Sequence, residues 1–122
     1  MMTMRVLAID RDRASLERLA GICRHYGAAF VGSQDLCEGL RWLNLSPVDM
    51  IFCDVAFLRD GRGNRFTMRD EEHTPLLVAT VGENSLQTEA SIRQLGLYYY
   101  LVKPFDQDEI GTLLASAERA LA

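Results

Sequence analysis

Short apolar runs alternate with segments of helical spacing along the whole chain. Five of these runs have the length and composition of buried β-strands, and a polar or charged residue follows each one. Because most of them lack a polar face, they predict a parallel sheet that helices cover on both sides. The predicted strands are Met4–Ile9, Ala28–Gly32, Val48–Cys53, Leu76–Ala79 and Tyr98–Val102.

Apolar residues at helical spacing follow four of the five strands. Gly27 is a suitable stop for the first predicted helix. Ser33 is a suitable N-cap for the second, and Pro47 ends it. Asp106 and Glu109 form a capping box at the start of the last helix. The apolar stripes lie within Leu16–Cys23, Leu36–Leu43, Asn84–Leu95 and Ile110–Leu121.

Strands joined by right-handed helical crossovers leave few topologies. Five such strands predict an α/β fold, the flavodoxin-like doubly wound sheet with strand order 2-1-3-4-5. One connection departs from the pattern. Arg59–His73 holds eight charged residues, two glycines and only two large apolar residues, so a shortened or irregular third helix inside a long loop is expected there.

Composition narrows the class of protein. With 122 residues, we expect one domain over residues 1–122. The net charge of −4 disfavours direct binding of nucleic acid, and no apolar run is long enough to span a membrane. Three widely spaced cysteines without a CxxC pair indicate reduced thiols and a cytoplasmic location.

Reactive side chains follow four of the predicted strands. Asp10, Asp54, Thr80 and Lys103 stand at the carboxyl ends, where ligands bind in sheets of this kind. A carboxylate in such a crevice can act as a nucleophile toward a phosphoryl group. A hydroxyl can donate to a phosphoryl oxygen, a lysine can offset its charge, and further acids can hold Mg²⁺.

These strand ends resemble the receiver domain of bacterial two-component response regulators, including the chemotaxis type. The resemblance covers almost the whole chain in the right order, and the segment Tyr100–Phe105 is its most specific part. It implies a signalling module and not an enzyme. The other matching segments are Met4–Asp10, Ile51–Asp54 and Ala79–Thr80.

The resemblance also implies a role for each matching residue. Asp54 takes the phosphoacceptor position, and Thr80 and Lys103 are the phosphoryl-sensing pair. Tyr100 stands where the family keeps a switching aromatic residue. The bond between Lys103 and Pro104 is expected to be cis, which costs little before proline.

The first acidic segment departs from the family pattern. The family has two adjacent acids there, the second a direct metal ligand, whereas this chain has Asp10 followed by Arg11. Asp12 lies one residue too late, although it can contribute to an acidic pocket with Asp10. We expect Arg11 to pair with Asp54 or Asp10 and to replace a metal ion, so that Mg²⁺ binding by Asp10 and Asp54 is doubtful and phosphorylation weakened or lost.

The implied partners are a histidine kinase or phosphotransferase and an output protein that binds the face formed by helix 4, strand 5 and helix 5. A homodimer is also compatible with the resemblance. One alternative is a phosphorylation-independent pseudo-receiver that binds a protein or an anionic ligand, for which the arginines of Arg59–Arg69 are candidates. A less favoured alternative is a flavodoxin-like ligand binder, because no glycine-rich phosphate loop follows the first strand.

Overall fold

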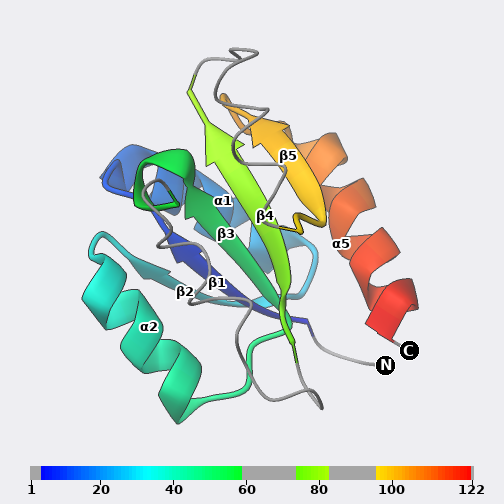
Figure 1. The fold of residues 1–122 in the computed structure, drawn as a ribbon. Helices are drawn as coiled ribbons and strands as arrows, with labels where there is room; N and C mark the ends of the chain where they lie inside the picture. The colour runs from blue at the N-terminus through cyan, green and yellow to red at the C-terminus, as the bar shows by residue number, and fades with distance from the viewer. Residues whose placement is uncertain (1–3, 59–73, 83–95, 122) are drawn as a thin grey trace.

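The structure, a computed structural model, describes residues 4–58, 74–82 and 96–121. These residues form a five-stranded parallel sheet in the order β2-β1-β3-β4-β5 (Figure 1). This order confirms the predicted doubly wound fold. The strands are β1 (Arg5–Ile9), β2 (Ala29–Ser33), β3 (Met50–Asp54), β4 (Leu76–Val81) and β5 (Tyr99–Val102).

Three α-helices are described. Helices α1 (Arg13–His25) and α5 (Gln107–Leu121) cover one face of the sheet, whereas α2 (Leu36–Leu45) packs on the other, against β1 and β2 (Figure 1). A short 3-10 helix, η1 (Val55–Phe57), directly follows β3. The irregular third helix expected within 59–73 and the helix expected over 84–95 lie outside the described residues.

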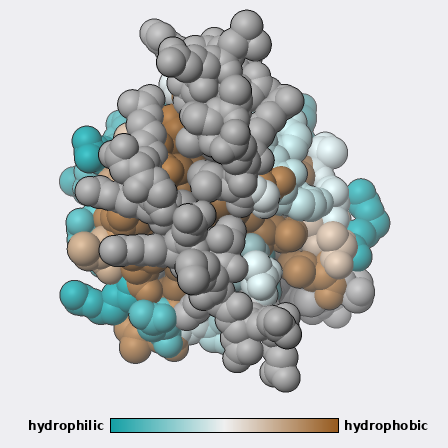
Figure 2. Space-filling model, viewed as in Figure 1, coloured by the Kyte–Doolittle hydropathy of each residue, from teal (hydrophilic) through white to brown (hydrophobic). Residues whose placement is uncertain are grey.

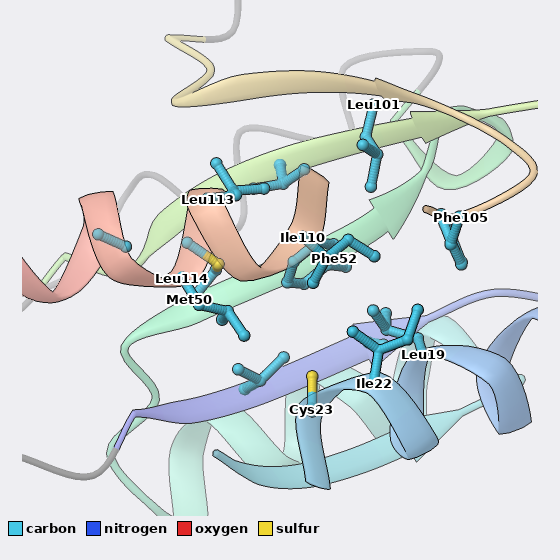
Figure 3. Close-up of a cluster of buried hydrophobic side chains, with 14 of the residues drawn as sticks. Leu19, Ile22, Cys23, Met50, Phe52, Leu101, Phe105, Ile110, Leu113 and Leu114 are labelled. Atoms are coloured by element: carbon cyan, nitrogen blue, oxygen red, sulfur yellow. The ribbon is translucent and has the colours of Figure 1, made fainter. Parts of the chain in front are cut away.

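The sheet separates two hydrophobic clusters. The first fills the space between the sheet, α1 and α5, and Figure 3 shows the side chains of both helices directed toward Phe52 and Met50 of β3. The second lies beneath α2 and includes Leu7, Ile9 and Ile51. Because each fully buried large apolar side chain stabilises the fold by about 2 kcal/mol, these clusters hold the strand ends in fixed relative positions.

Local signals account for the helix ends. Helix α1 stops before Gly27, which has a φ of 78° and is in the left-handed region that glycine tolerates. One half of the capping box is confirmed, since the Asp106 carboxylate accepts the Glu109 N–H at 2.9 Å, whereas the Glu109 carboxylate accepts the Tyr99 hydroxyl. The prediction for α2 was wrong by two residues: Asp35, not Ser33, is the N-cap, because the Ser33 hydroxyl is bonded to the backbone of Asp35.

The tyrosine run before and within β5 differs from the expected alternation. Alternation along the predicted strand Tyr98–Val102 would put Tyr98 and Tyr100 on one face of the sheet. Instead Tyr98 packs against the α1–α5 cluster and Tyr100 against the α2 cluster. The difference arises because β5 begins only at Tyr99, so Tyr98 lies in the bend that precedes the strand.

The surface is of mixed character. Figure 2 shows hydrophobic residues (brown) reaching the surface on the viewed face, with hydrophilic residues (teal) toward its left and right margins. Within the described ranges, no helix has both the length and the hydropathy that crossing a bilayer requires.

Candidate functional site

A single ammonium group joins two carboxylates at the carboxyl end of the sheet. The Nζ of Lys103 lies 2.6 Å from Oδ2 of Asp10 and 3.0 Å from Oδ2 of Asp54. All three side chains are largely buried, with exposed fractions of 8% for Asp10, 18% for Asp54 and 17% for Lys103. Three of the four residues predicted from the strand ends, Asp10, Asp54 and Lys103, are therefore brought together.

The backbone places the two acids side by side. Asp10 follows β1 directly, and its N–H donates to the Ser33 carbonyl of β2 at 3.0 Å. Asp54 is the last residue of β3, which neighbours β1 in the sheet with Ile9 opposite Cys53. Since both strands are parallel and in register, their next side chains meet at the same edge.

The remaining oxygens of the two acids are also engaged. Oδ1 of Asp10 accepts the N–H of Asp12 at 2.9 Å. Oδ1 of Asp54 accepts the N–H of Ala56 at 2.9 Å and so caps η1. Each of the four carboxylate oxygens thus accepts an N–H donor from this chain.

The expected sensing residues lie beside this pair of acids. Thr80 is 2% exposed and stands opposite Asp54 in the β3–β4 register. The N–H of Lys103 donates to the Val81 carbonyl at 2.8 Å, which fixes the lysine beyond the end of β4. The peptide bond before Pro104 is cis, as predicted. Tyr100 has a buried hydroxyl and packs against the α2 cluster.

Asp12 does not join the acidic pocket. Its carboxylate accepts the Ala14 N–H at 3.1 Å and the Ser15 hydroxyl at 2.8 Å, so it serves as the N-cap of α1. The bond from Ser15 is the main reason why the pKa of Asp12 is lowered. The side chain is exposed, and the prediction that it belongs to the pocket of Asp10 is corrected accordingly.

Arg11 is not the cation that bridges the acids. Its guanidinium carbon lies 5.2 Å from the centroid of the Phe57 ring, in cation–π geometry, and the residue is exposed. The expected ion pair with Asp54 or Asp10 is therefore wrong: Lys103 occupies that place. The reason is side-chain direction: Lys103 is anchored beside β4 and its ammonium extends to both acids, whereas Arg11 turns outward after β1.

The charge balance of the crevice affects the lysine. Burial by itself lowers the pKa of Lys103, but the hydrogen bonds and the charges of Asp10 and Asp54 outweigh burial and raise the pKa above its ordinary value. Lys103 is therefore an ammonium ion throughout the neutral range. It supplies one positive charge against two carboxylates.

The donor set does not fit a magnesium ion. Mg²⁺ prefers oxygen ligands in octahedral geometry, and only Asp10 and Asp54 offer carboxylates here. The Lys103 ammonium already contacts one oxygen of each, Asp12 caps α1, and position 11 holds an outward-turned arginine in place of an acid. No group of three His, Cys, Asp or Glu side chains suited to a metal occurs among the residues that the structure describes.

Two contributors were not predicted from the sequence. The Nε of Arg18 in α1 donates to the Phe105 carbonyl at 2.6 Å, which fastens the turn after Pro104. Phe57 supplies the ring under Arg11. Neither residue carries a sequence signal for these roles, because each contact joins segments that are distant along the chain. Cys53, which precedes Asp54, is buried, and its pKa is raised by that burial, so it is not a reactive thiol.

Comparison with known proteins agrees with this geometry. The sequence profile of the response regulator receiver domain matches residues 6–115. Over 107 residues the chain is 28% identical to the acid tolerance regulatory protein ActR of Rhizobium meliloti (strain 1021), covering 86% of this chain and 55% of that protein. The chain thus spans about half the length of this relative.

Solved structures show the same fold. A response regulator from Thermotoga maritima superimposes with a TM-score of 0.82 at 18% identity, covering 95% of this chain and 98% of that one. The beryllofluoride-activated NtrC4 receiver domain dimer gives 0.80 at 22% identity, covering 97% and 98%. The chain therefore belongs to the family of response regulator receiver domains, as the resemblance of its sequence predicted.

Proposed function

We propose that this receiver domain is an atypical signalling module in which Asp54 holds the phosphoacceptor position but Mg²⁺-dependent phosphorylation is weak or lost. The observation that carries the proposal is the bridge from Lys103 to both Asp10 and Asp54. Receiver domains typically bind Mg²⁺ for phosphorylation. In this chain the Lys103 ammonium already offsets part of the charge of the two acids, and Arg11 stands where the family has a metal-ligand acid.

The chemistry explains why this arrangement slows the reaction. An oxygen of Asp54 must attack phosphorus while the bond to the donor nitrogen or oxygen breaks, and each of its two oxygens already accepts one hydrogen bond that draws on its charge. Negative charge on the phosphoryl oxygens must also be stabilised in the transition state. Lys103 and Thr80 are the groups beside Asp54 suited to that task, and the lysine is already shared between two carboxylates.

Phosphorylation from a small donor tests the proposal. The chain is incubated with acetyl phosphate, with and without Mg²⁺, and intact mass spectrometry follows the added phosphoryl group. We expect little labelling and no dependence on Mg²⁺, with the Asp54→Asn variant as the baseline. Rapid Mg²⁺-dependent labelling that disappears in Asp54→Asn would falsify the proposal.

Restoring the family's acid at position 11 sharpens the test. Arg11→Asp adds a carboxylate and removes a positive charge next to Asp10, so Mg²⁺ affinity is expected to rise at least about tenfold, or roughly 1.4 kcal/mol. Arg13→Asp is the matched control, because Arg13 is exposed on α1 and paired with Glu17. Magnesium titration followed by NMR chemical shifts measures both. Equal, unchanged affinity in the two variants would place the defect elsewhere in the crevice.

The proposed partners follow from family membership. We expect a histidine kinase or phosphotransferase on the input side and an output protein on the face of helix 4 (the helix expected over 84–95), β5 and α5, of which β5 and α5 are described. On that face the hydroxyl of Tyr99 donates to Glu109 at 3.0 Å. Location in the cytoplasm and a single domain over residues 1–122 stay predictions.

A second candidate is constitutive binding without phosphorylation. The same bridge favours this candidate, because Lys103 contacts Asp54 although Asp54 carries no phosphoryl group. The Asp54→Asn variant distinguishes the two: a pseudo-receiver binds its output partner equally well in this variant and in the unchanged chain. The arginines of Arg59–Arg69, candidates for an anion site, lie outside the described residues.

A further inference from the structure

The guanidinium of Arg11 is available to bind an anion beside the acid crevice. It lies over the ring of Phe57, and among the residues that the structure describes it neither pairs with a carboxylate nor donates to a carbonyl. The residue is exposed, and an arginine side chain carries five N–H donors. A planar group of this kind suits the paired oxygens of a phosphoryl group.

The backbone holds Arg11 at the rim of the crevice. Arg11 directly follows Asp10, and the parallel strands β1 and β3 hold Asp10 and Asp54 side by side. The Arg11 carbonyl accepts the Nε2 of Gln34 at 2.8 Å, which fixes this turn against the segment after β2. The ring of Phe57 belongs to η1, the short helix that Asp54 caps. The guanidinium therefore lies where the segments after β1 and β3 meet.

A phosphoryl group would leave the crevice short of positive charge. At rest the ammonium of Lys103 opposes the carboxylates of Asp10 and Asp54, which leaves one negative charge unbalanced. A phosphoryl group on Asp54 carries a charge of roughly −2 at neutral pH, in place of the single charge of the carboxylate. Receiver domains typically use Mg²⁺ for this reaction, and the donor set here does not fit that ion. Arg11 is a second cation beside the crevice, without an ion pair to give up within the described ranges.

We infer that Arg11 turns inward from Phe57 during phosphoryl transfer and binds the phosphoryl oxygens, so that Asp54 reacts slowly without a metal ion. The inference rests on the proposed function, because it takes Asp54 as the phosphoacceptor. With acetyl phosphate, an oxygen of Asp54 forms a bond to phosphorus while the bond from phosphorus to the acetyl oxygen breaks, and acetate leaves with that electron pair. Arg11 and Lys103 then oppose the negative charge on the phosphoryl oxygens.

The exchange of contacts favours the inward position once a phosphoryl group is present. A cation over an aromatic ring at an exposed site is held weakly. Hydrogen bonds from a guanidinium to phosphoryl oxygens carry charge on both partners and are roughly twice as strong as bonds between neutral groups. Before the donor binds, the ring of Phe57 keeps the guanidinium near the crevice, so that less side-chain entropy is lost on binding. Phe57 is thus a positioning residue for Arg11.

Phosphorylation in the absence of metal tests the role of Arg11. The chain is incubated with acetyl phosphate in EDTA, and intact mass spectrometry measures the initial rate of labelling, with Asp54→Asn as the baseline. We expect slow labelling that falls about tenfold in Arg11→Ala and less in Arg11→Lys, which keeps the charge but not the paired donors. Arg13→Ala is the matched control, because Arg13 is exposed and paired with Glu17, and it should label like the unchanged chain.

Two results overturn the inference: labelling of Arg11→Ala at the rate of the unchanged chain, and no labelling of Asp54 in EDTA. The proposed function fails on a different result, rapid labelling of the unchanged chain that requires Mg²⁺. Circular dichroism checks that Arg11→Ala is folded, as its exposed position leads us to expect.

An acid at position 11 should reverse the dependence on metal. Arg11→Asp removes the guanidinium, so its labelling in EDTA should be as slow as that of Arg11→Ala. Added Mg²⁺ should then accelerate labelling of Arg11→Asp and leave the rate of the unchanged chain the same. A rate in EDTA that is equal in Arg11→Asp and the unchanged chain contradicts the inference.

A double-mutant cycle tests the positioning role of Phe57. Phe57→Leu keeps an apolar side chain but removes the ring, so labelling in EDTA should slow about twofold. In the Arg11→Ala background the same substitution should have no further effect, because no guanidinium is left to position. An equal loss in both backgrounds would mean that Phe57 acts only through the fold and would remove its role in the inference.

Discussion

The segment after β1 and the segment after β5 both reach the acid crevice, yet they are built differently. After β5, Lys103 is held by the backbone of Val81, a cis bond precedes Pro104, and the Phe105 carbonyl accepts from α1. After β1, only Asp10 faces inward, while the next two residues turn to the surface and to the helix end. The segment after β5 thus supplies the inward-facing cation, and the segment after β1 supplies none.

The largest expected effect comes from removing the anchored cation. Lys103→Met leaves Asp10 and Asp54 facing each other without a counter-charge, so we expect the free energy of unfolding to fall by about 3 kcal/mol at neutral pH. Urea denaturation measures it. Arg119→Met, an exposed site on α5, is the control and should change stability little.

A second substitution tests the cause. Adding Asp10→Asn to Lys103→Met removes one of the two facing charges and should recover part of the loss. If the double variant is no more stable than Lys103→Met, repulsion between the two carboxylates is not the cause of the lower free energy of unfolding. The segments after β1 and β5 then do not stabilise each other through their charges.

The same ion pair predicts a loss of stability at alkaline pH. Because the pKa of Lys103 is raised in the folded state, its stabilising effect is present below the ordinary lysine pKa of 10.5 and is lost as the pH rises through the higher folded pKa. Lys103 is the only lysine in the sequence, so reductive ¹³C-methylation labels it and the terminal amine alone. NMR titration should give a pKa above that of the same group in the urea-unfolded chain. A folded value equal to or below the unfolded one contradicts the assignment.

A smaller effect is expected in the segment after β1. Asp12→Ala removes the acceptor for the Ala14 N–H and the Ser15 hydroxyl, so we expect the melting temperature to drop by a few degrees. Asp12→Asn, which keeps a capping oxygen, should restore most of it. Calorimetry measures both variants. An unchanged melting temperature in Asp12→Ala would mean that the cap contributes nothing to stability.

The smallest effect is expected at Arg11. Arg11→Ala removes the cation above the Phe57 ring at an exposed site, which is worth about 0.5 kcal/mol. Arg24→Ala, exposed near the end of α1, is the control. A loss of several kcal/mol in Arg11→Ala would show that Arg11 does neutralise the crevice, and would remove the contrast between the two segments.

Strand ends were predictable because apolar runs stop where the sheet stops. Asp10, Asp54, Thr80 and Lys103 were all placed correctly at one edge from this pattern alone. The sequence does not show, however, which of two cationic side chains contacts the acids. Whether Arg11 or Lys103 reaches the acids depends on which backbone directs its side chain inward, and that is settled by the sheet register and not by spacing.

Local competition explains the other differences. Ser33 and Asp35 are both suitable N-cap residues. The path of the backbone after β2 decides which of the two side chains lies over the first turn of α2. Tyr98 departs from the alternation because it lies in the bend before β5, and the boundary of a strand is the least predictable part of its pattern.

The bond from Arg18 to the Phe105 carbonyl has a consequence for mutational scans of this domain. Because this bond holds the turn next to Lys103 against α1, a substitution on α1 can change the position of Lys103 without touching the crevice. Loss of signalling after a change at Arg18 therefore does not by itself identify a docking residue. The pKa of Lys103, measured in the same variant, distinguishes the two causes. A changed pKa indicates that the turn has moved, whereas an unchanged pKa indicates a lost docking contact.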